Sequence, residues 1–230
     1  MKKFIIVFSA LIVLYFAYDT VRYRLGWYID LHPQQEVTAF MSTDEQNIYM
    51  DRGSGAEPFT IKGVNLGVGS PAQWATDYAI DRATYLRWFG QMQEMGANTV
   101  RVYITLHDDF YNAFYAYNTA REAAGEEPLW LIHGVWVNDY VQNSHRDAYD
   151  KDFLDAFIRD GRTLVDVLHG NKKIALGRGT GSGSYTNDVS RWVIGYILGV
   201  EWEDVTVTYT DHKYPDKAPY QGTYLSATGD

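Results

Sequence analysis

Short apolar runs of strand length alternate with helical segments over residues 61–204, and this alternation limits the fold more than any other feature. The runs that we predict to be strands are residues 61–66, 99–104, 129–135 and the apolar part of 192–204. Successive strand and helix units of this kind form a parallel sheet. We therefore expect an α/β domain with about four βα units.

Two of the intervening segments have a clear helical period. One begins after Asp81, a suitable N-cap, and ends at Gly96, with Tyr85, Phe89 and Met92 on one face. The other covers residues 151–168 and ends at Gly170. A shorter helix is predicted over residues 110–117, and residues 47–50 and 59–64 are expected to pair as a hairpin.

The N-terminus combines a basic start, Lys2 and Lys3, with an apolar run over residues 4–18. No small-x-small cleavage site follows the run, and Tyr15, Phe16 and Tyr18 at its end are too bulky for one, so we predict an uncleaved signal anchor over residues 1–22 rather than a removed peptide. Residues 23–58 would be a juxtamembrane connector and residues 59–230 the main domain. The basic start favours a cell-membrane protein with its domain on the extracellular side, although Arg22 and Arg24 weaken this orientation. A buried hairpin or helix in a soluble protein is the alternative.

Composition excludes several classes of protein. The chain has 230 residues, 46% of them apolar, which is enough for one sizeable core. A net charge of -9 and the lack of basic clusters argue against nucleic acid as a partner. The absence of cysteine excludes disulfides and thiolate metal sites. We expect no cofactor.

The fourth apolar run, over residues 192–204, ends abruptly in a carboxylate, Glu201. Strict alternation would place Gly195, Ile197, Gly199 and Glu201 on one face of the strand. An acid delivered to the carboxyl end of a buried strand is typical of catalytic groups in α/β enzymes. A solvated strand-end residue or a salt-bridge partner fits the same pattern.

Other polar residues interrupt the predicted strands. Arg101 lies in an apolar strand, on the same side as Tyr103, and needs an anion or a solvated opening because an unpaired buried charge is costly. Asn65, at the end of the first strand, fits either a substrate hydroxyl or a turn. His133 fits a hydrogen-bonded core residue at least as well as a ligand.

Two further clusters suggest sites. His107, Asp108 and Asp109 are potential ligands, but no third or fourth ligand follows at a zinc-site spacing, so no metal site is predicted. The glycine-rich residues 177–184 lack the Lys-Ser/Thr ending of a phosphate loop, which favours a mobile surface or active-site loop.

Four segments, taken in order, resemble the first half of the TIM (β/α)8 barrel of clan A glycoside hydrolases, especially families 2 and 5. They are residues 59–67, 95–103, 129–136 and 193–202. Gly63-Val64-Asn65 matches a G-x-N element, residues 96–101 match G-x-N-x-x-R, and Val200-Glu201 stands where the clan has Asn-Glu. The resemblance implies that Glu201 is the general acid/base and that Arg101 lines the site. The other substrate-binding residues that it suggests are Asn65, His133, Trp136 and Trp202.

The chain departs from this pattern in two ways. Val200 replaces an asparagine whose amide is expected to contact the sugar 2-hydroxyl. A complete barrel takes about 250 residues, whereas residues 59–230 supply about 170. We therefore expect a partial barrel without the nucleophilic glutamate, inactive unless the missing C-terminal half or a partner chain completes it.

The sequence thus favours the N-terminal half of a membrane-anchored, exported glycosidase that hydrolyses O-glycosidic bonds by a retaining mechanism. The alternative is a non-catalytic module that binds glycan or protein, with Trp74, Trp136 and Trp202 as stacking surfaces. A membrane-tethered structural domain is a third hypothesis.

Overall fold

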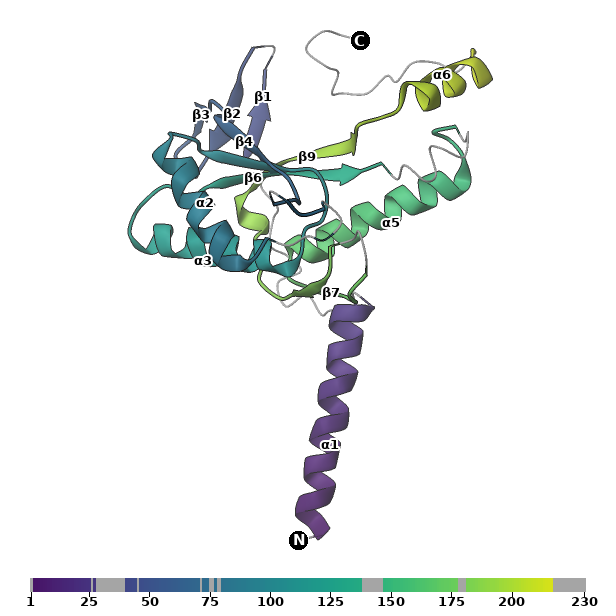
Figure 1. The fold of residues 1–230 in the computed structure, drawn as a ribbon. Coiled ribbons are helices and arrows are strands. Elements are labelled where there is room, and N and C mark those ends of the chain that lie inside the picture. The colour runs from purple at the N-terminus through teal and green to yellow at the C-terminus, as the bar shows by residue number, and fades with distance from the viewer. Residues whose placement is uncertain are drawn as a thin grey trace.

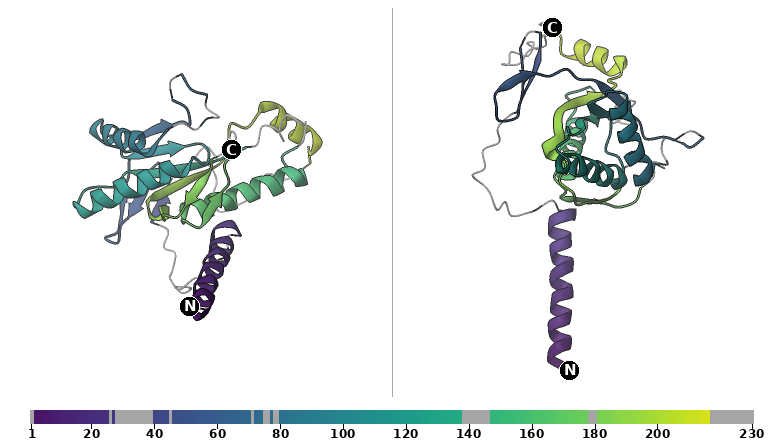
Figure 2. Two further views of the ribbon diagram at one scale, coloured as in Figure 1. Left: turned by 60° about the horizontal axis from the view of Figure 1, so that its bottom comes forward. Right: turned by 90° about the vertical axis from the view of Figure 1, so that its left-hand side faces the viewer.

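In the computed structural model the chain forms a mixed α/β domain with a long N-terminal helix projecting from it (Figure 1). The structure describes residues 2–25, 27, 40–44, 46–70, 72–74, 77, 80–137, 147–177 and 181–216. The free end of the N-terminal helix and helix α6 (Asp204–Lys213) lie on opposite sides of the domain (Figure 2).

A four-stranded parallel sheet forms the centre of the domain. Its strands are β4 (Gly63–Leu66), β5 (Thr99–Val102), β6 (Trp130–Trp136) and β9 (Val193–Val200). They lie side by side in chain order, β4-β5-β6-β9, and each neighbouring pair is parallel. The four predicted strands and the parallel sheet are confirmed, with shifts of one to two residues at most of the ends.

Helices connect these strands. The connecting helices are α2 (Arg82–Glu94), α3 (Asp108–Ala123) and α5 (Lys151–Leu168), whereas α6, which the sequence analysis did not predict, follows β9. The carboxylate of Asp81 accepts a hydrogen bond from the Thr84 amide at 2.8 Å, which confirms it as the N-cap of α2. Gly96, with φ of +87°, ends the following turn. Helix α3 is longer than the predicted residues 110–117.

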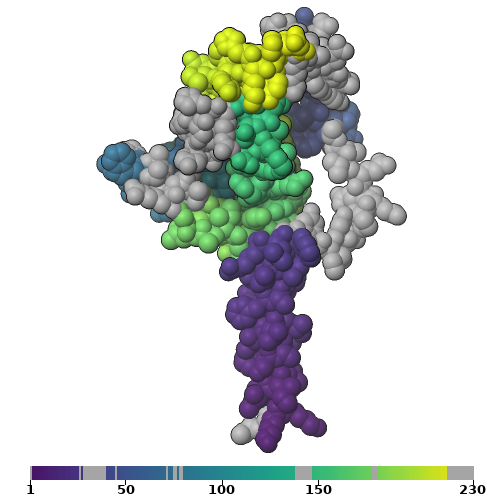
Figure 3. Space-filling view, turned by 90° about the vertical axis from the view of Figure 1, so that its right-hand side faces the viewer, coloured from purple at the N-terminus to yellow at the C-terminus, as the bar shows by residue number. Residues whose placement is uncertain are grey.

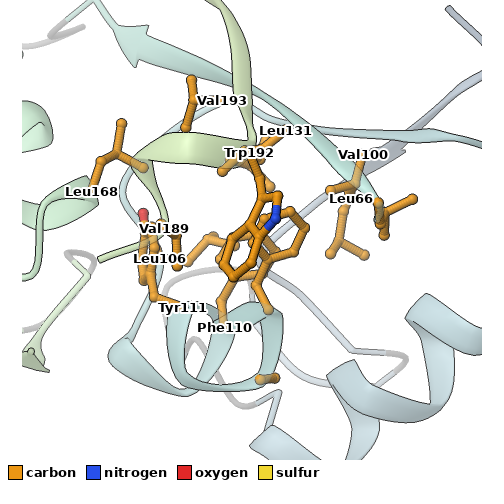
Figure 4. Packing of buried hydrophobic residues seen from close by; sticks show 14 of the residues in the cluster. Leu66, Val100, Leu106, Phe110, Tyr111, Leu131, Leu168, Val189, Trp192 and Val193 are labelled. Atoms are coloured by element: carbon orange, nitrogen blue, oxygen red, sulfur yellow. The ribbon is translucent and has the colours of Figure 1, made fainter. Parts of the chain in front are cut away.

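One face of the sheet packs against α2 and α3 and forms the core. Leu66, Val100, Val102 and Leu131 point to this side, and all four are buried. They meet a group of aromatic rings that includes Phe110 of α3 (Figure 4). Burying one Leu or Phe side chain contributes about 1.5–3 kcal/mol, so this face supplies most of the packing that holds the sheet.

The opposite face of the sheet is open over much of its area. Asn65 is exposed, and Arg101, Ile132 and Ile197 are half-buried. Near the amino ends of the strands the face is covered, because the first residue of β6, Trp130, lies against two rings of the preceding segment. These rings are Phe40 and Phe59, with centroids 6.1 and 6.5 Å from that of Trp130. The carboxyl half of this face is the more accessible part.

The segment before the sheet forms a small antiparallel sheet of β1 (Met41–Thr43), β2 (Ile48–Asp51) and β3 (Ala56–Pro58). The hairpin prediction located the first strand but was wrong about the second. Residues 56–58, rather than 59–64, pair with β2. A short turn after Asp51 brings the chain back directly, and Phe59 is then free to pack on Trp130.

The glycine-rich segment is part of a second hairpin, β7 (Lys172–Ile174) with β8 (Gly183–Tyr185). The amide of Ser182 donates to Nδ1 of His107, and that of Ser184 donates to the Asp108 carboxylate, each at 2.8 Å. The described part of this segment, from residue 181, is therefore held against the start of α3. Residues 178–180 of the expected mobile loop lie outside the described residues.

The N-terminal helix is α1 (Lys2–Asp19), continued by a π-helical turn, η1 (Thr20–Arg24). Together they make 23 residues, which include an 18-residue stretch with a mean hydropathy of 2.1 and no buried residue. At 1.5 Å per residue this length is about 35 Å, against roughly 30 Å for a bilayer core. Length and composition fit a membrane anchor and a signal sequence alike.

We predict that Gly134→Ala destabilises the domain by about 1–3 kcal/mol. A Cβ at Gly134 would lie 2.6 Å from the Tyr103 carbonyl oxygen and 2.8 Å from Val200 Cγ2. Gly195→Ala is the matched control in the adjacent strand, since the nearest atom to its Cβ is Ile132 Cγ1 at 3.9 Å. Thermal unfolding of both variants measures the difference, and equal melting temperatures would contradict the predicted crowding.

Candidate active site

Two predicted site residues meet on the open face of the sheet. Asn65 of β4 and Arg101 of β5 occupy paired register positions. Nη1 of Arg101 donates a hydrogen bond to Oδ1 of Asn65 at 3.2 Å, and the guanidinium carbon lies 4.8 Å from the centroid of the Tyr103 ring. The sequence analysis did not name Tyr103 as a site residue, although strand alternation had placed it on the side of Arg101.

The sequence element that contains Arg101, residues 96–101, also contributes Asn98, which has a structural role. The side chain of Asn98 accepts from the Lys62 amide and donates to the Thr60 carbonyl, both at 2.8 Å. These two bonds tie the segment entering β4 to the segment entering β5. They fix the register that brings Asn65 beside Arg101.

Arg101 has no acidic partner in the part of the chain that the structure describes. Its Nε is buried and has no hydrogen-bond acceptor there. A buried donor without an acceptor costs about 1–3 kcal/mol. The open face therefore presents a cation that a carboxylate or another oxygen acceptor would stabilise.

Glu201 lies directly after β9, at its carboxyl end, but its backbone differs from the expected alternation. Leu198 and Val200 pair with consecutive residues of β6, so Gly199, with φ of +84°, is an extra residue in the strand. This bulge moves Val200 onto the face that it would otherwise point away from. The prediction that Gly199 and Glu201 continue one face is wrong for this reason.

The backbone of Glu201 is in the left-handed region, with φ of +56°. A residue other than glycine is uncommon there, and such conformations occur preferentially at functional sites. The side chain is exposed and forms no ion pair within the described residues. Of the two simpler interpretations, a solvated strand end fits these observations and a salt-bridge partner does not.

The two predicted tryptophans lie in different places. Trp136 shares its face of β6 with Ile132, the register partner of Arg101, and is half-buried. Trp202 instead packs on α5, with ring centroids 5.6 Å from Phe153 and 6.1 Å from Phe157. Its indole also covers Gly199, where a Cβ would come within 2.1 Å of Nε1. Trp202 is thus a support for the bulge, and Trp136 remains a candidate for substrate contact.

His133 does not belong to this site. Its position in β6 alternates with Ile132, so it points to the core, where it is fully buried. Nε2 lies 2.8 Å from the Tyr111 hydroxyl, and Nδ1 lies 2.9 Å from the Gly134 carbonyl oxygen. Burial lowers the pKa of His133 to about 4. The expectation that it binds substrate gives way to a structural role.

The described residues contain no group of three or more side chains placed to hold a metal ion. His107 accepts from the amide of Ser182, just before β8, and Asp108 accepts from that of Ser184, within β8. Asp109 stands in the first turn of α3. Burial, with the adjacent charge of Asp108, raises the pKa of Asp109. This cluster anchors a hairpin.

No family model, curated protein or solved structure matches this chain. What the structure defines is a mixed α/β domain with a parallel sheet and an N-terminal apolar helix. Its candidate site is the Asn65 and Arg101 pair, with Trp136 on the same face and Glu201 at the end of β9.

Titration of His133 should make stability depend on pH. The unfolded histidine takes up a proton near pH 6.5, and the buried one does so only near pH 4. Between these values the unfolded state binds more protons, so stability falls as the pH falls, by roughly 3 kcal/mol over the window. Denaturant unfolding in detergent measures this slope. His133→Gln should reduce it by about one proton, and an unchanged slope would contradict the assignment.

The left-handed backbone at residue 201 leads to a second prediction. Glu201→Gly should be more stable than Glu201→Ala by about 1 kcal/mol, because only glycine adopts this conformation without a steric cost. Both variants remove the carboxylate, so their difference isolates the backbone. Equal unfolding midpoints would show that residue 201 is not held at positive φ.

Proposed function

We propose that this chain supplies the first four βα units of a (β/α)8 barrel of the glycoside hydrolase type. The observation that carries the proposal is the placement of Asn65 and Arg101 in neighbouring strands, and of Glu201 directly after β9, in a sheet whose strands follow chain order. Helices α2 and α3 cover one face, whereas a doubly wound sheet has helices on both. A barrel interior would correspond to the open face.

In the proposed reaction Glu201 protonates the leaving glycosidic oxygen and later activates a water molecule. A retaining mechanism needs a second carboxylate about 5 Å away as the nucleophile. The resemblance assigns it to a seventh strand, and the described sheet has four. Further strands or a partner chain would therefore supply it, and Arg101, whose charge has no acidic partner here, is suited to orient it.

A second candidate function is a glycan-binding module without catalysis. Val200 is the observation that favours it, because this side chain is buried against β6 where the hydrolases have an amide that contacts the sugar. Trp136 on the open face and Trp74, which is 79% exposed, would be the stacking surfaces.

We further propose that α1 and η1 anchor the protein in the cell membrane with the domain on the extracellular side. The helix is long enough to span a bilayer, and Lys2 and Lys3 are its first two residues. Arg22, one of the two basic residues that weaken this orientation, is hydrogen-bonded to Asn171 of the domain at 3.1 Å. Arg22, in η1, therefore has a structural role in addition to any effect on membrane topology.

The catalytic proposal is tested by Glu201→Gln in membranes of cells that produce the protein. Hydrolysis of a panel of aryl glycosides should fall at least about 100-fold, since the general acid/base is lost. Glu203→Gln is the matched control: it removes an acid two residues away, before α6, and should retain activity. Hydrolysis that survives Glu201→Gln would refute the assigned role.

The binding module gives a different result in the same membranes. Neither the unaltered protein nor Glu201→Gln would hydrolyse any glycoside, and oligosaccharides would still quench the tryptophan fluorescence of the purified protein. Trp136→Ala should abolish that quenching, because stacking on the half-buried indole of Trp136 is the expected contact.

A further inference from the structure

The end of the N-terminal helix is fastened to the β7 hairpin of the domain. Asp19 forms an ion pair with Lys173, whose ammonium also lies 4.8 Å from the centroid of the Tyr23 ring. Arg22 donates through Nε to Oδ1 of Asn171 at 3.1 Å and through Nη1 to the Tyr18 hydroxyl at 2.8 Å. Figure 3 shows the light green residues of this region resting on the upper end of α1.

These contacts are partly shielded from water. The side chains of Lys173 and Asp19 are 26% and 15% exposed, so solvent screens their attraction less than that of a surface pair. Together with the Arg22 bond to Asn171 they restrict both tilt and rotation at the junction. The domain is thereby held in one orientation with respect to α1.

Large apolar side chains near this junction are exposed. Leu25 is 55% exposed, Trp27 is 70% exposed and Leu176 is 88% exposed. The amides of Leu25 and Trp27 donate to carbonyls of η1, so both stay at the helix end. Leu176 is three residues beyond Lys173, so its Cα lies within about 10 Å of the Cα of Lys173. The ammonium of Lys173 in turn contacts the Tyr23 ring.

A lipid interface explains this combination better than bulk water does. Single exposed leucines are ordinary on protein surfaces, but these side chains gather where a 23-residue apolar helix meets its domain. Aromatic side chains are enriched at the membrane interface, and arginine can extend from it to lipid phosphates. Tyr23, Trp27 and Arg24 are residues of these types at that position.

We propose that the juxtamembrane surface, formed by Arg24, Leu25, Trp27 and Leu176, lies in the lipid headgroup region and seats the domain on the membrane. This inference rests on the proposed role of α1 as an anchor. In Figure 1 the arrows of β6 and β9 run across the axis of α1. A domain seated in this way directs the carboxyl ends of its strands along the membrane, so a glycan would enter from the side.

The chain has no cysteine, so a single introduced thiol can be labelled specifically. The experiment places an environment-sensitive fluorophore on Leu176→Cys in the full chain, reconstituted in phosphatidylcholine vesicles with and without doxyl-labelled lipid. We expect a blue-shifted emission and at least twofold quenching by the doxyl lipid. Leu198→Cys is the matched control, because this leucine of β9 is 69% exposed and β9 lies away from α1.

A second variant tests the fastening. Lys173→Ala in the Leu176→Cys background removes the partner of Asp19 and should reduce the quenching severalfold while α1 stays in the bilayer. Its retention in the membrane is measured by alkaline carbonate extraction. Quenching at position 176 that persists in Lys173→Ala would overturn the proposed role of the ion pair.

Each remaining outcome bears on a different statement. A protein that resists carbonate extraction but shows equal, weak quenching at positions 176 and 198 would overturn the seated orientation and leave the anchor intact. Extraction of the protein by alkaline carbonate would overturn the proposed membrane anchor, and with it the proposed position of the domain on the membrane. A blue shift at position 176 that disappears as the protein is diluted in lipid would indicate a second copy on this surface, and would also overturn the proposal.

Discussion

A parallel sheet is stable when both of its faces are covered, and the described chain covers most of one of them. Helices α2 and α3 bury Leu66, Val100 and Leu131, while Arg101 on the other side stays half-buried. The amino ends are closed by the rings packed on Trp130. Three features follow from this asymmetry. The candidate site is exposed, Arg101 lacks an acidic partner among the described residues, and the proposed barrel needs further strands or a partner.

The geometry of the strand end depends on a contact between distant parts of the chain. Trp202 packs on Phe153 and Phe157 of α5 and covers Gly199, the extra residue of β9. Only glycine leaves room for the indole at that place. The bulge in turn places Glu201 after the strand in a left-handed conformation. The backbone of a residue proposed for chemistry thus depends on a contact with α5.

Much of the fold could be predicted from the sequence, because period and capping are local properties. The strands, the N-cap at Asp81 and the apolar N-terminal helix were all located in advance. The partner of β2 was misplaced, since turn length competes there with the packing of Phe59 on Trp130. Similarly, His133 and Trp202 were assigned to the site because a strand end alone does not reveal which neighbours fill the core.

The sequence by itself determined the parallel sheet, the position of Glu201 at the end of a strand, and the placement of Asn65 and Arg101 near the ends of neighbouring strands. Only the tertiary structure decided which side chains share the open face. Period-two alternation holds for a regular strand, and one extra residue reverses it. Whether a bulge forms at Gly199 depends on Trp202 meeting α5, a contact between segments some 45 residues apart, and no local pattern encodes that contact.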